Sequence, residues 1–208
     1  MADFRVISHR GYWKDPAEKN TAVAFRRSFE LGFGTETDVR DRGGELVIAH
    51  DPPRGGEMLL EEVLSMLPDE PLHLALNIKA DGLAGPLRKA MQGAKASWFT
   101  FDMSVPELLS QLRAGMPAYT RASEYEMAPP CLDEAHGVWV DAFHDTWWTV
   151  ESLLALAGGK PVCIVSPELH GREPEAMWSA LREASREGGD FTLCTDLPEQ
   201  AATYFGVP

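Results

Sequence analysis

Apolar and polar positions follow two different periods along this chain. Short apolar runs bounded by turn-forming residues are typical of buried strands, and longer stretches with apolar residues every three or four positions are typical of amphipathic helices. The strands that this pattern predicts are 4–8, 35–40, 72–79, 98–102, 118–122, 138–141, 162–166 and 191–195. The helices that it predicts are 21–31, 59–67, 83–91, 106–114, 150–157, 174–187 and 198–204. Strands and helices therefore alternate, and about eight right-handed β/α units in one α/β domain close most economically into a (β/α)8 TIM barrel.

Local signals support the predicted helix boundaries. Ser104 and the pair Thr195-Asp196 each stand before an early proline and an acid, which is typical of a capped helix start. Four helices are followed by glycine, at 32, 115, 158–159 and 188–189. The fifth unit lacks a helix, because 123–136 shows no helical period and Pro129-Pro130 would interrupt one. We expect a loop or a short turn there.

The composition indicates a single globular domain over residues 1–208. Hydrophobic residues make up 44% of the chain, enough for a substantial core. Nineteen basic and 32 acidic residues give a net charge of −13, which argues against nonspecific binding to nucleic acid or to an anionic membrane. An anionic substrate would therefore need a local positive site.

Two further observations concern the compartment. The first residues lack the basic flank and apolar core of a secretion signal, and no run approaches the ~18 apolar residues of a membrane span. We therefore expect a cytoplasmic protein with no stable membrane insertion. Cys131, Cys163 and Cys194 are odd in number and far apart, which favours buried free thiols over disulfides or metal ligands.

Three polar groups follow apolar runs in the first quarter of the chain. His9-Arg10 follows residues 4–8, Glu36-Thr37-Asp38 follows 31–33, and His50-Asp51 follows 46–49. Each group is therefore expected where a buried strand emerges. Side chains alternate across a strand, so Glu36 and Asp38 should point to the same side. Taken one at a time, a strand-end histidine is more often structural and an E-x-D pair is more often solvated surface.

Together, these groups predict a metal-assisted phosphodiester site. Two carboxylates on one face repel each other unless a cation offsets their charge, and oxygen ligands favour Mg²⁺, Ca²⁺ or Mn²⁺ over zinc. His9 and His50 are then available to take a proton from the nucleophile and to deliver one to the leaving oxygen. Arg10 can stabilise the charge that develops on the phosphorus centre. A substrate hydroxyl could attack first, with water then opening the cyclic phosphate.

The same residues resemble the glycerophosphodiester phosphodiesterase family, whose fold is the phospholipase C-like phosphodiesterase barrel. The matching segments are Ile7-Ser8-His9-Arg10-Gly11, Asn20-Thr21-Ala22-Val23-Ala24-Phe25, Gly34-Thr35-Glu36-Thr37-Asp38-Val39, Val47-Ile48-Ala49-His50-Asp51 and Cys194-Thr195-Asp196-Leu197-Pro198. The resemblance implies that His9 and His50 form the acid/base pair, Arg10 binds phosphate, and Glu36 and Asp38 bind the metal. It implies a small-molecule phosphodiester as substrate, with sn-glycerol 3-phosphate and an alcohol as products.

One departure from the family pattern concerns the metal site. The family has a glutamate two residues before Lys79, and here Asn77 stands at that position. An amide oxygen can still bind Mg²⁺ or Ca²⁺, more weakly unless Glu168 or Asp102 reaches in. Lys79, on the same strand face as Asn77, either contacts the phosphate or pairs with a carboxylate.

A second departure concerns the substrate. Residues 51–72 leave room for little beyond one helix, so the family's inserted subdomain, which shapes the glycerol pocket, is predicted to be missing. The segment 164–170 differs from the family as well, and His170 within it is interpreted as a loop residue. These differences leave a phospholipid or a surface-polysaccharide phosphodiester as alternative substrates. A further alternative, suggested by Asn77, is a catalytically degenerate barrel that binds a phosphorylated ligand. The sequence predicts no oligomeric state.

Overall fold

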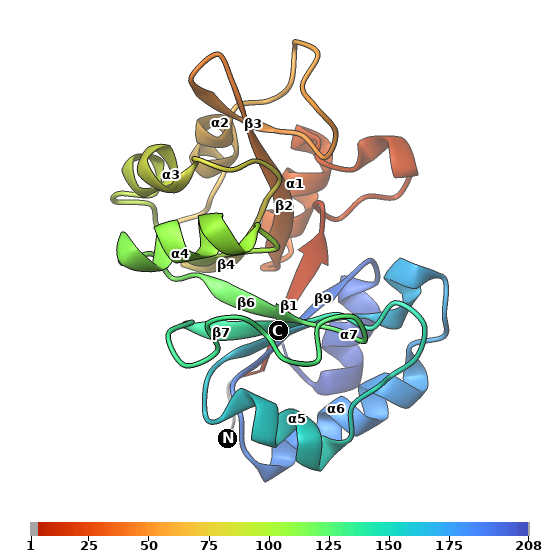
Figure 1. Ribbon diagram of the computed structural model, residues 1–208. Coiled ribbons are helices and arrows are strands. Elements are labelled where there is room, and N and C mark those ends of the chain that lie inside the picture. The colour runs from red at the N-terminus through yellow and green to blue at the C-terminus, as the bar shows by residue number, and fades with distance from the viewer. Residues whose placement is uncertain (1–3, 208) are drawn as a thin grey trace. The chain divides into compact units, whose positions relative to one another are not determined.

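The computed structural model describes residues 4–207 (Figure 1). The strands are β1 (Phe4–His9), β2 (Gly34–Arg42), β3 (Glu45–Ile48), β4 (Leu72–Ile78), β5 (Ala96–Phe101), β6 (Tyr119–Ala122), β7 (Gly137–Val140), β8 (Val162–Val165) and β9 (Phe191–Thr195). The α-helices are α1 (Ala22–Glu30), α2 (Leu60–Ser65), α3 (Ala84–Ala90), α4 (Val105–Arg113), α5 (Val150–Ala157), α6 (Glu175–Glu187) and α7 (Pro198–Phe205). Two 3₁₀ turns, η1 (Pro16–Glu18) and η2 (Pro167–His170), complete the order.

The strands form one sheet in the order β5-β4-β2-β1-β9-β8-β7-β6, with β3 attached to β2 beside this path. β4 is parallel to both β2 and β5, and β6 to β9 are parallel to one another in sequence order. A parallel bridge between Thr100 and Ala118 joins β5 to the residue that precedes β6. Eight strands on one path with intervening helices confirm the predicted (β/α)8 TIM-barrel fold.

The chain packs as two compact units. One contains the residues up to Ile7 together with those from Tyr119 onward, and the other contains Ser8–Ala118.

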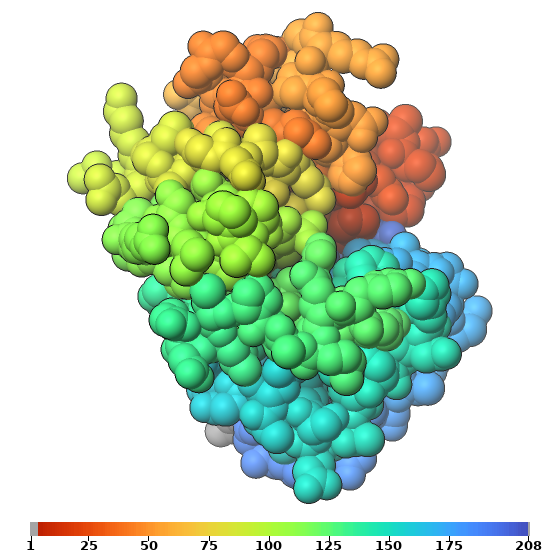
Figure 2. All heavy atoms as spheres, viewed as in Figure 1, coloured from red at the N-terminus to blue at the C-terminus, as the bar shows by residue number. Residues whose placement is uncertain are grey.

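Every predicted strand and helix is confirmed, with ends that differ by two residues or fewer. The residues 123–136 contain only bends and turns, as predicted, and this link between β6 and β7 lies on the surface in view in Figure 2, in green to turquoise.

The core of the Ser8–Ala118 unit explains which face of β4 carries the chemistry. Leu74, Leu76 and Ile78 alternate along β4 and pack with Phe25 of α1 and Leu87 of α3. Because successive side chains point to opposite faces of a strand, Asn77 and Lys79 lie on the other face, away from these helices. The packing of the apolar side chains of β4 against the helices therefore fixes the direction in which its polar side chains point.

Two expectations about strands need correction. Residues 31–33 are not a strand, since Leu31 is 47% exposed just after α1 and the chain turns there. Glu36 and Asp38 accordingly lie inside β2, which runs to Arg42. The run that leads to His50 is also not a barrel strand, because β3 pairs antiparallel with β2, with Val39 opposite Ile48.

The hairpin between β2 and β3 has a simple physical origin. β2 continues past Val39, where its pairing with β4 ends, and the chain reverses at Gly43-Gly44. Both glycines have positive φ angles, 59° and 92°, which side-chain-bearing residues adopt only with strain. The returning strand brings Ala49 N to 3.1 Å from Asp38 O, so His50 returns to the level of the carboxylates.

The remaining local predictions divide. Ser104 caps α4, accepting a hydrogen bond from Glu107 N at 3.2 Å, as predicted. The predicted cap at Thr195-Asp196 is wrong by one residue, because Leu197 is the N-cap and Thr195 Oγ1 accepts from Leu197 N instead. The three cysteines are free, with Cys163 and Cys194 buried. Within residues 4–207, no helix has the length and apolar character needed to cross a membrane.

Candidate active site

The turn after β1 places His9 and Arg10 against β2. Arg10 has a φ of 57° and Gly11 a φ of 79°. A Cβ on Gly11 would lie 2.7 Å from the Cβ of Ala24, so only glycine fits this position. The turn is tied to β2 by two hydrogen bonds, from Arg10 N to Glu36 O (3.0 Å) and from Gly11 N to Thr35 Oγ1 (2.9 Å).

The two carboxylates predicted to share a face are both buried. Glu36 is 2% exposed and Asp38 is fully buried. Glu36 Oε2 lies 4.0 Å from His9 Nε2 and accepts a hydrogen bond from Arg10 N at 3.2 Å. Asp38 Oδ2 lies 2.9 Å from Arg10 Nε and accepts a hydrogen bond from Asn20 Nδ2 at 2.9 Å. The first two predicted groups therefore form one cluster.

Burial raises the pKa of Glu36 to about 7, and the carboxylate of Asp38 adds to this rise. The neighbouring His9, Arg10 and Lys79 lower the same pKa, and their effect is smaller. A further positive charge beside Glu36 would favour its ionised form.

Lys79 lies between two carboxylates at the end of β4. Its Nζ is 3.2 Å from Asp102 Oδ2 and 3.6 Å from Asp38 Oδ1. The sequence left open whether Lys79 contacts the phosphate or pairs with a carboxylate, and in the structure it pairs with carboxylates. Asp102 binds this lysine, and Glu168, the other acid considered as a metal ligand, accepts hydrogen bonds from Thr195 Oγ1 and Asp196 N.

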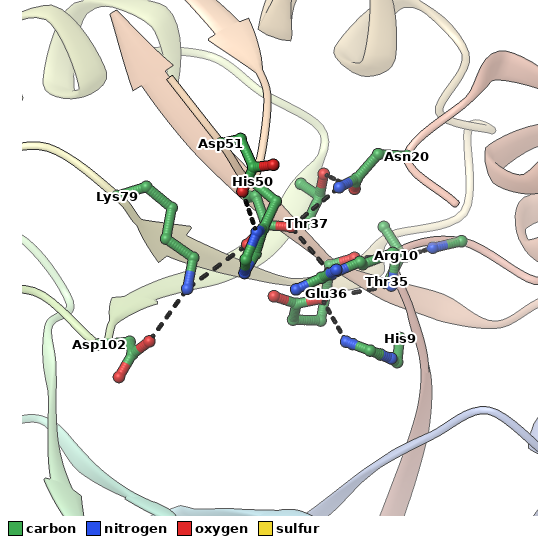
Figure 3. Close-up of polar contacts among 12 residues, drawn as sticks. His9, Arg10, Asn20, Thr35, Glu36, Thr37, His50, Asp51, Lys79 and Asp102 are labelled. Carbon is green, nitrogen blue, oxygen red and sulfur yellow. Dashed lines mark hydrogen bonds and ion pairs between the residues drawn. The ribbon is translucent and has the colours of Figure 1, made fainter. Parts of the chain in front are cut away.

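His50 reaches the cluster from the hairpin. Its side chain is 51% exposed, and its Nδ1 lies 2.9 Å from Asp51 Oδ1. Arg40 Nε and Nη2 donate to the carbonyl oxygen of His50 at 3.0 and 2.9 Å, which anchors its backbone. In Figure 3, His9, His50 and Lys79 approach Glu36 from three different segments.

The oxygen atoms of this cluster fit a hard divalent cation. Asp38 and Asn77 are register partners on β2 and β4, so their side chains are neighbours. Asp38 Oδ1 and Asn77 Oδ1 are both buried, and neither has a hydrogen-bond partner. Buried acceptors are rarely left in this state, and a cation would satisfy both. The described residues hold no group of three or more His, Cys, Asp or Glu side chains placed to bind a metal, and the candidate set here is two carboxylates and the amide of Asn77.

Sequence reasoning assigned no role to one residue of this cluster. Asn20 donates from Nδ2 to Asp38, and its Oδ1 accepts from Thr37 Oγ1 at 2.9 Å. Its φ is 59°, in the left-handed region that Asn tolerates better than most residues. The one sequence signal for Asn20 was its place in the segment 20–25, which resembles the family motif. Its hydrogen bonds to β2 could not be predicted from local periodicity.

Solved structures of two kinds of phosphodiesterase share this architecture. A glycerophosphodiester phosphodiesterase from Parabacteroides distasonis ATCC 8503 superposes with a TM-score of 0.57 at 16% identity, over 99% of this chain and 98% of that chain. A Ca²⁺-dependent phosphatidylinositol-specific phospholipase C from Streptomyces antibioticus superposes with a TM-score of 0.60 at 11% identity, also over 99% of this chain and 98% of that chain. This chain shares the barrel fold of these two enzymes.

The barrel fold shared with these two structures confirms what the motif resemblance implied about architecture. No protein-family model and no curated protein matches the sequence. The barrel is a short one, and α2 is the helix described between β3 and β4, as expected from the length of that segment.

Proposed function

We propose that this protein is a metal-dependent phosphodiester hydrolase that acts by His/His acid–base catalysis. The observation that carries the proposal is the pair of buried oxygens on Asp38 and Asn77 that have no hydrogen-bond partner, next to Glu36 and within a cluster that includes two histidines. The fold shared with two phosphodiesterases supports the same reaction class.

Glu36, Asp38 and Asn77 would hold the cation. When bound, a divalent cation supplies positive charge to a nonbridging phosphate oxygen and lowers the pKa of an attacking hydroxyl. Mg²⁺, Ca²⁺ and Mn²⁺ all suit three oxygen donors, and the Ca²⁺ dependence of the phospholipase C neighbour favours Ca²⁺.

The side chains around the cation site would bind phosphate and move protons. Arg10 and Lys79 bring two positive charges to the site. Because the whole chain carries a net charge of −13, an anionic substrate needs such local positive charges in order to bind. Glu36 Oε2 lies 4.0 Å from His9 Nε2, which places the imidazole ring beside the proposed cation site. Asp51 holds Nδ1 of His50, which leaves Nε2 of that ring for proton transfer.

The proposed substrate is a small polar phosphodiester, cleaved to a phosphomonoester and an alcohol. If the substrate carries glycerol, the monoester is sn-glycerol 3-phosphate. A second candidate is the phosphodiester of an inositol phospholipid, because the phospholipase C neighbour is specific for phosphatidylinositol. The single helix between β3 and β4 is compatible with either substrate.

The test is a hydrolysis assay of the purified protein. The substrates are glycerophosphocholine, glycerophosphoethanolamine, glycerophosphoinositol, phosphatidylinositol vesicles and bis(p-nitrophenyl) phosphate, each with Mg²⁺, Ca²⁺, Mn²⁺ or EDTA. We expect metal-dependent release of a phosphomonoester that falls by about 10² or more in His9→Ala and His50→Ala. His136→Ala, at an exposed position just before β7 in the other compact unit, is the matched control.

The outcomes separate the candidates. Release of glycerol 3-phosphate identifies a glycerophosphodiester substrate, and cleavage of the vesicles alone identifies the phospholipid. Binding of a phosphorylated ligand without turnover in any of the metals would favour the catalytically degenerate barrel over the hydrolase.

A further inference from the structure

Lys79 occupies a position that could block the proposed cation site. Its Nζ forms an ion pair with Asp38 Oδ1 at 3.6 Å, just beyond hydrogen-bond distance, and that oxygen is one of the two that accept no hydrogen bond. On its other side Lys79 donates to Asp102 Oδ2 at 3.2 Å. The lysine is therefore held nearer to Asp102 than to the buried carboxylate.

We propose that Asp102 is a positioning residue that holds Lys79 away from Asp38 and so keeps Asp38 Oδ1 open for the cation. This inference rests on the proposed function, because it assumes that the cation binds at Asp38. It assigns to Asp102 a role different from that of a substitute metal ligand.

The backbone at Asp102 supports this role. β5 ends at Phe101, whose register partner on β4 is Asn77. A regular continuation would place Asp102 level with Ile78, with its side chain on the face opposite to Asn77 and Lys79. The chain instead adopts a φ of 64° at Asp102, a left-handed conformation that turns the carboxylate toward Lys79. Such conformations persist where the surrounding structure requires them.

The charges explain what Asp102 prevents. Asp38 is fully buried and carries a negative charge that attracts Lys79 and Arg10 together. A shift of a few tenths of an ångström would bring Nζ into a charge-assisted hydrogen bond with Oδ1. The ammonium group would then occupy the lone pairs that the cation needs. Asp102 opposes this shift, since it offers Lys79 a closer carboxylate.

The test is the affinity for the metal alone, measured by isothermal titration calorimetry with CaCl₂ and with MnCl₂. The proteins are the wild type, Asp102→Asn, Lys79→Met and the double variant. Asparagine tolerates the left-handed backbone, so Asp102→Asn removes the charge and retains the conformation. Asp81→Asn is the matched control, because Asp81 lies just after β4 and Lys79, and its Oδ1 accepts a hydrogen bond from Ser104 Oγ (2.8 Å) and not from the lysine.

We expect Asp102→Asn to weaken cation binding by about tenfold and Asp81→Asn to leave it unchanged. In the Lys79→Met background, Asp102→Asn should have no effect, because the lysine that it controls is gone. Thermal unfolding of each variant, recorded by circular dichroism, checks that the fold is intact.

Three results would overturn the inference. Equal affinity of Asp102→Asn and wild type would show that Asp102 does not control Lys79. An equal loss in both backgrounds would show a general charge effect or direct ligation by Asp102. Absence of any binding by the wild type would remove both this inference and the cation in the proposed function, whereas the first two results leave the proposed function intact.

Discussion

Individual residues of the site are held in place by contacts with residues that are distant in the sequence. Arg10, Asn20 and Asp102 all have left-handed φ angles, between 57° and 64°, and each contacts a carboxylate or lysine of the cluster. The sequence could single out His9, Arg10, Glu36 and Asp38 as candidates from their residue types and spacing, and the structure brings them together. It could not predict the partners of Asn20 and Asp102, because a left-handed turn leaves no periodic signal.

At this scale the loop that presents Asn20 depends on Glu18. Its carboxylate accepts from Arg27 Nη1 at 2.7 Å and from Lys14 N at 2.9 Å, and the hydrogen bond from Arg27 is the main reason that the pKa of Glu18 falls to about 2. A lowered carboxyl pKa contributes stability above the unfolded-state value of 4.5, and this contribution is lost as the pH falls toward 2.

We therefore expect Glu18→Gln to lower the urea midpoint of unfolding at pH 7, with a difference from wild type that shrinks as the pH falls from 4.5 to 3. Urea titrations followed by tryptophan fluorescence measure this difference. Glu30→Gln, at an exposed position of α1, controls for the loss of one charge. A difference that stays constant from pH 7 to pH 3 would contradict the role assigned to Glu18.

At the scale of elements, the apolar pattern predicted the strands and helices well because most residues of the parallel strands are buried on both faces. β4 illustrates this, with Leu74, Leu76 and Ile78 on one face and Asn77 on the other, all less than one-tenth exposed. The hairpin of β2 and β3 was not recognised, since its short second strand reads as one more buried run. Gly43-Gly44 was the local signal for the reversal.

Leu76 and Leu31 provide a direct test of the element boundaries. Leu76 on β4 is fully buried, so Leu76→Ala should cost about 2–5 kcal/mol of unfolding free energy. Leu31, which is 47% exposed after α1, should cost less than about 0.5 kcal/mol when changed to Ala. Urea unfolding of both variants measures the two values. Similar losses would mean that residues 31–33 are a buried strand after all.

At the scale of the whole molecule, fold similarity extends over nearly the full length of chains that share only 11% and 16% of their residues with this one. The order of strands and helices, which the sequence predicts, is what these chains have in common. The substrate could not be predicted, because it depends on segments where this chain departs from the family pattern.

The net charge of −13 should oppose the approach of anionic substrates over distances up to about the Debye length, which falls from ~30 Å at 0.01 M salt to ~8 Å at 0.15 M. With the cation saturating, we expect kcat/KM for anionic glycerophosphoinositol to rise roughly threefold over this range of NaCl. The value for zwitterionic glycerophosphocholine should stay nearly constant. A fall with salt for both substrates would indicate that the local cations, and not the net charge, control association.

The attachment of His50 to a hairpin has a consequence for heat inactivation. β3 pairs with β2 alone among the strands of the sheet path, and most of the residues from 50 to 56 after it are exposed, so this segment can open while Ile48 stays in the core. Its opening would remove one of the two histidines proposed to transfer protons and leave the remaining structure folded. The protein would then lose turnover on warming before it loses its tertiary structure, and it would regain turnover on cooling without having to refold.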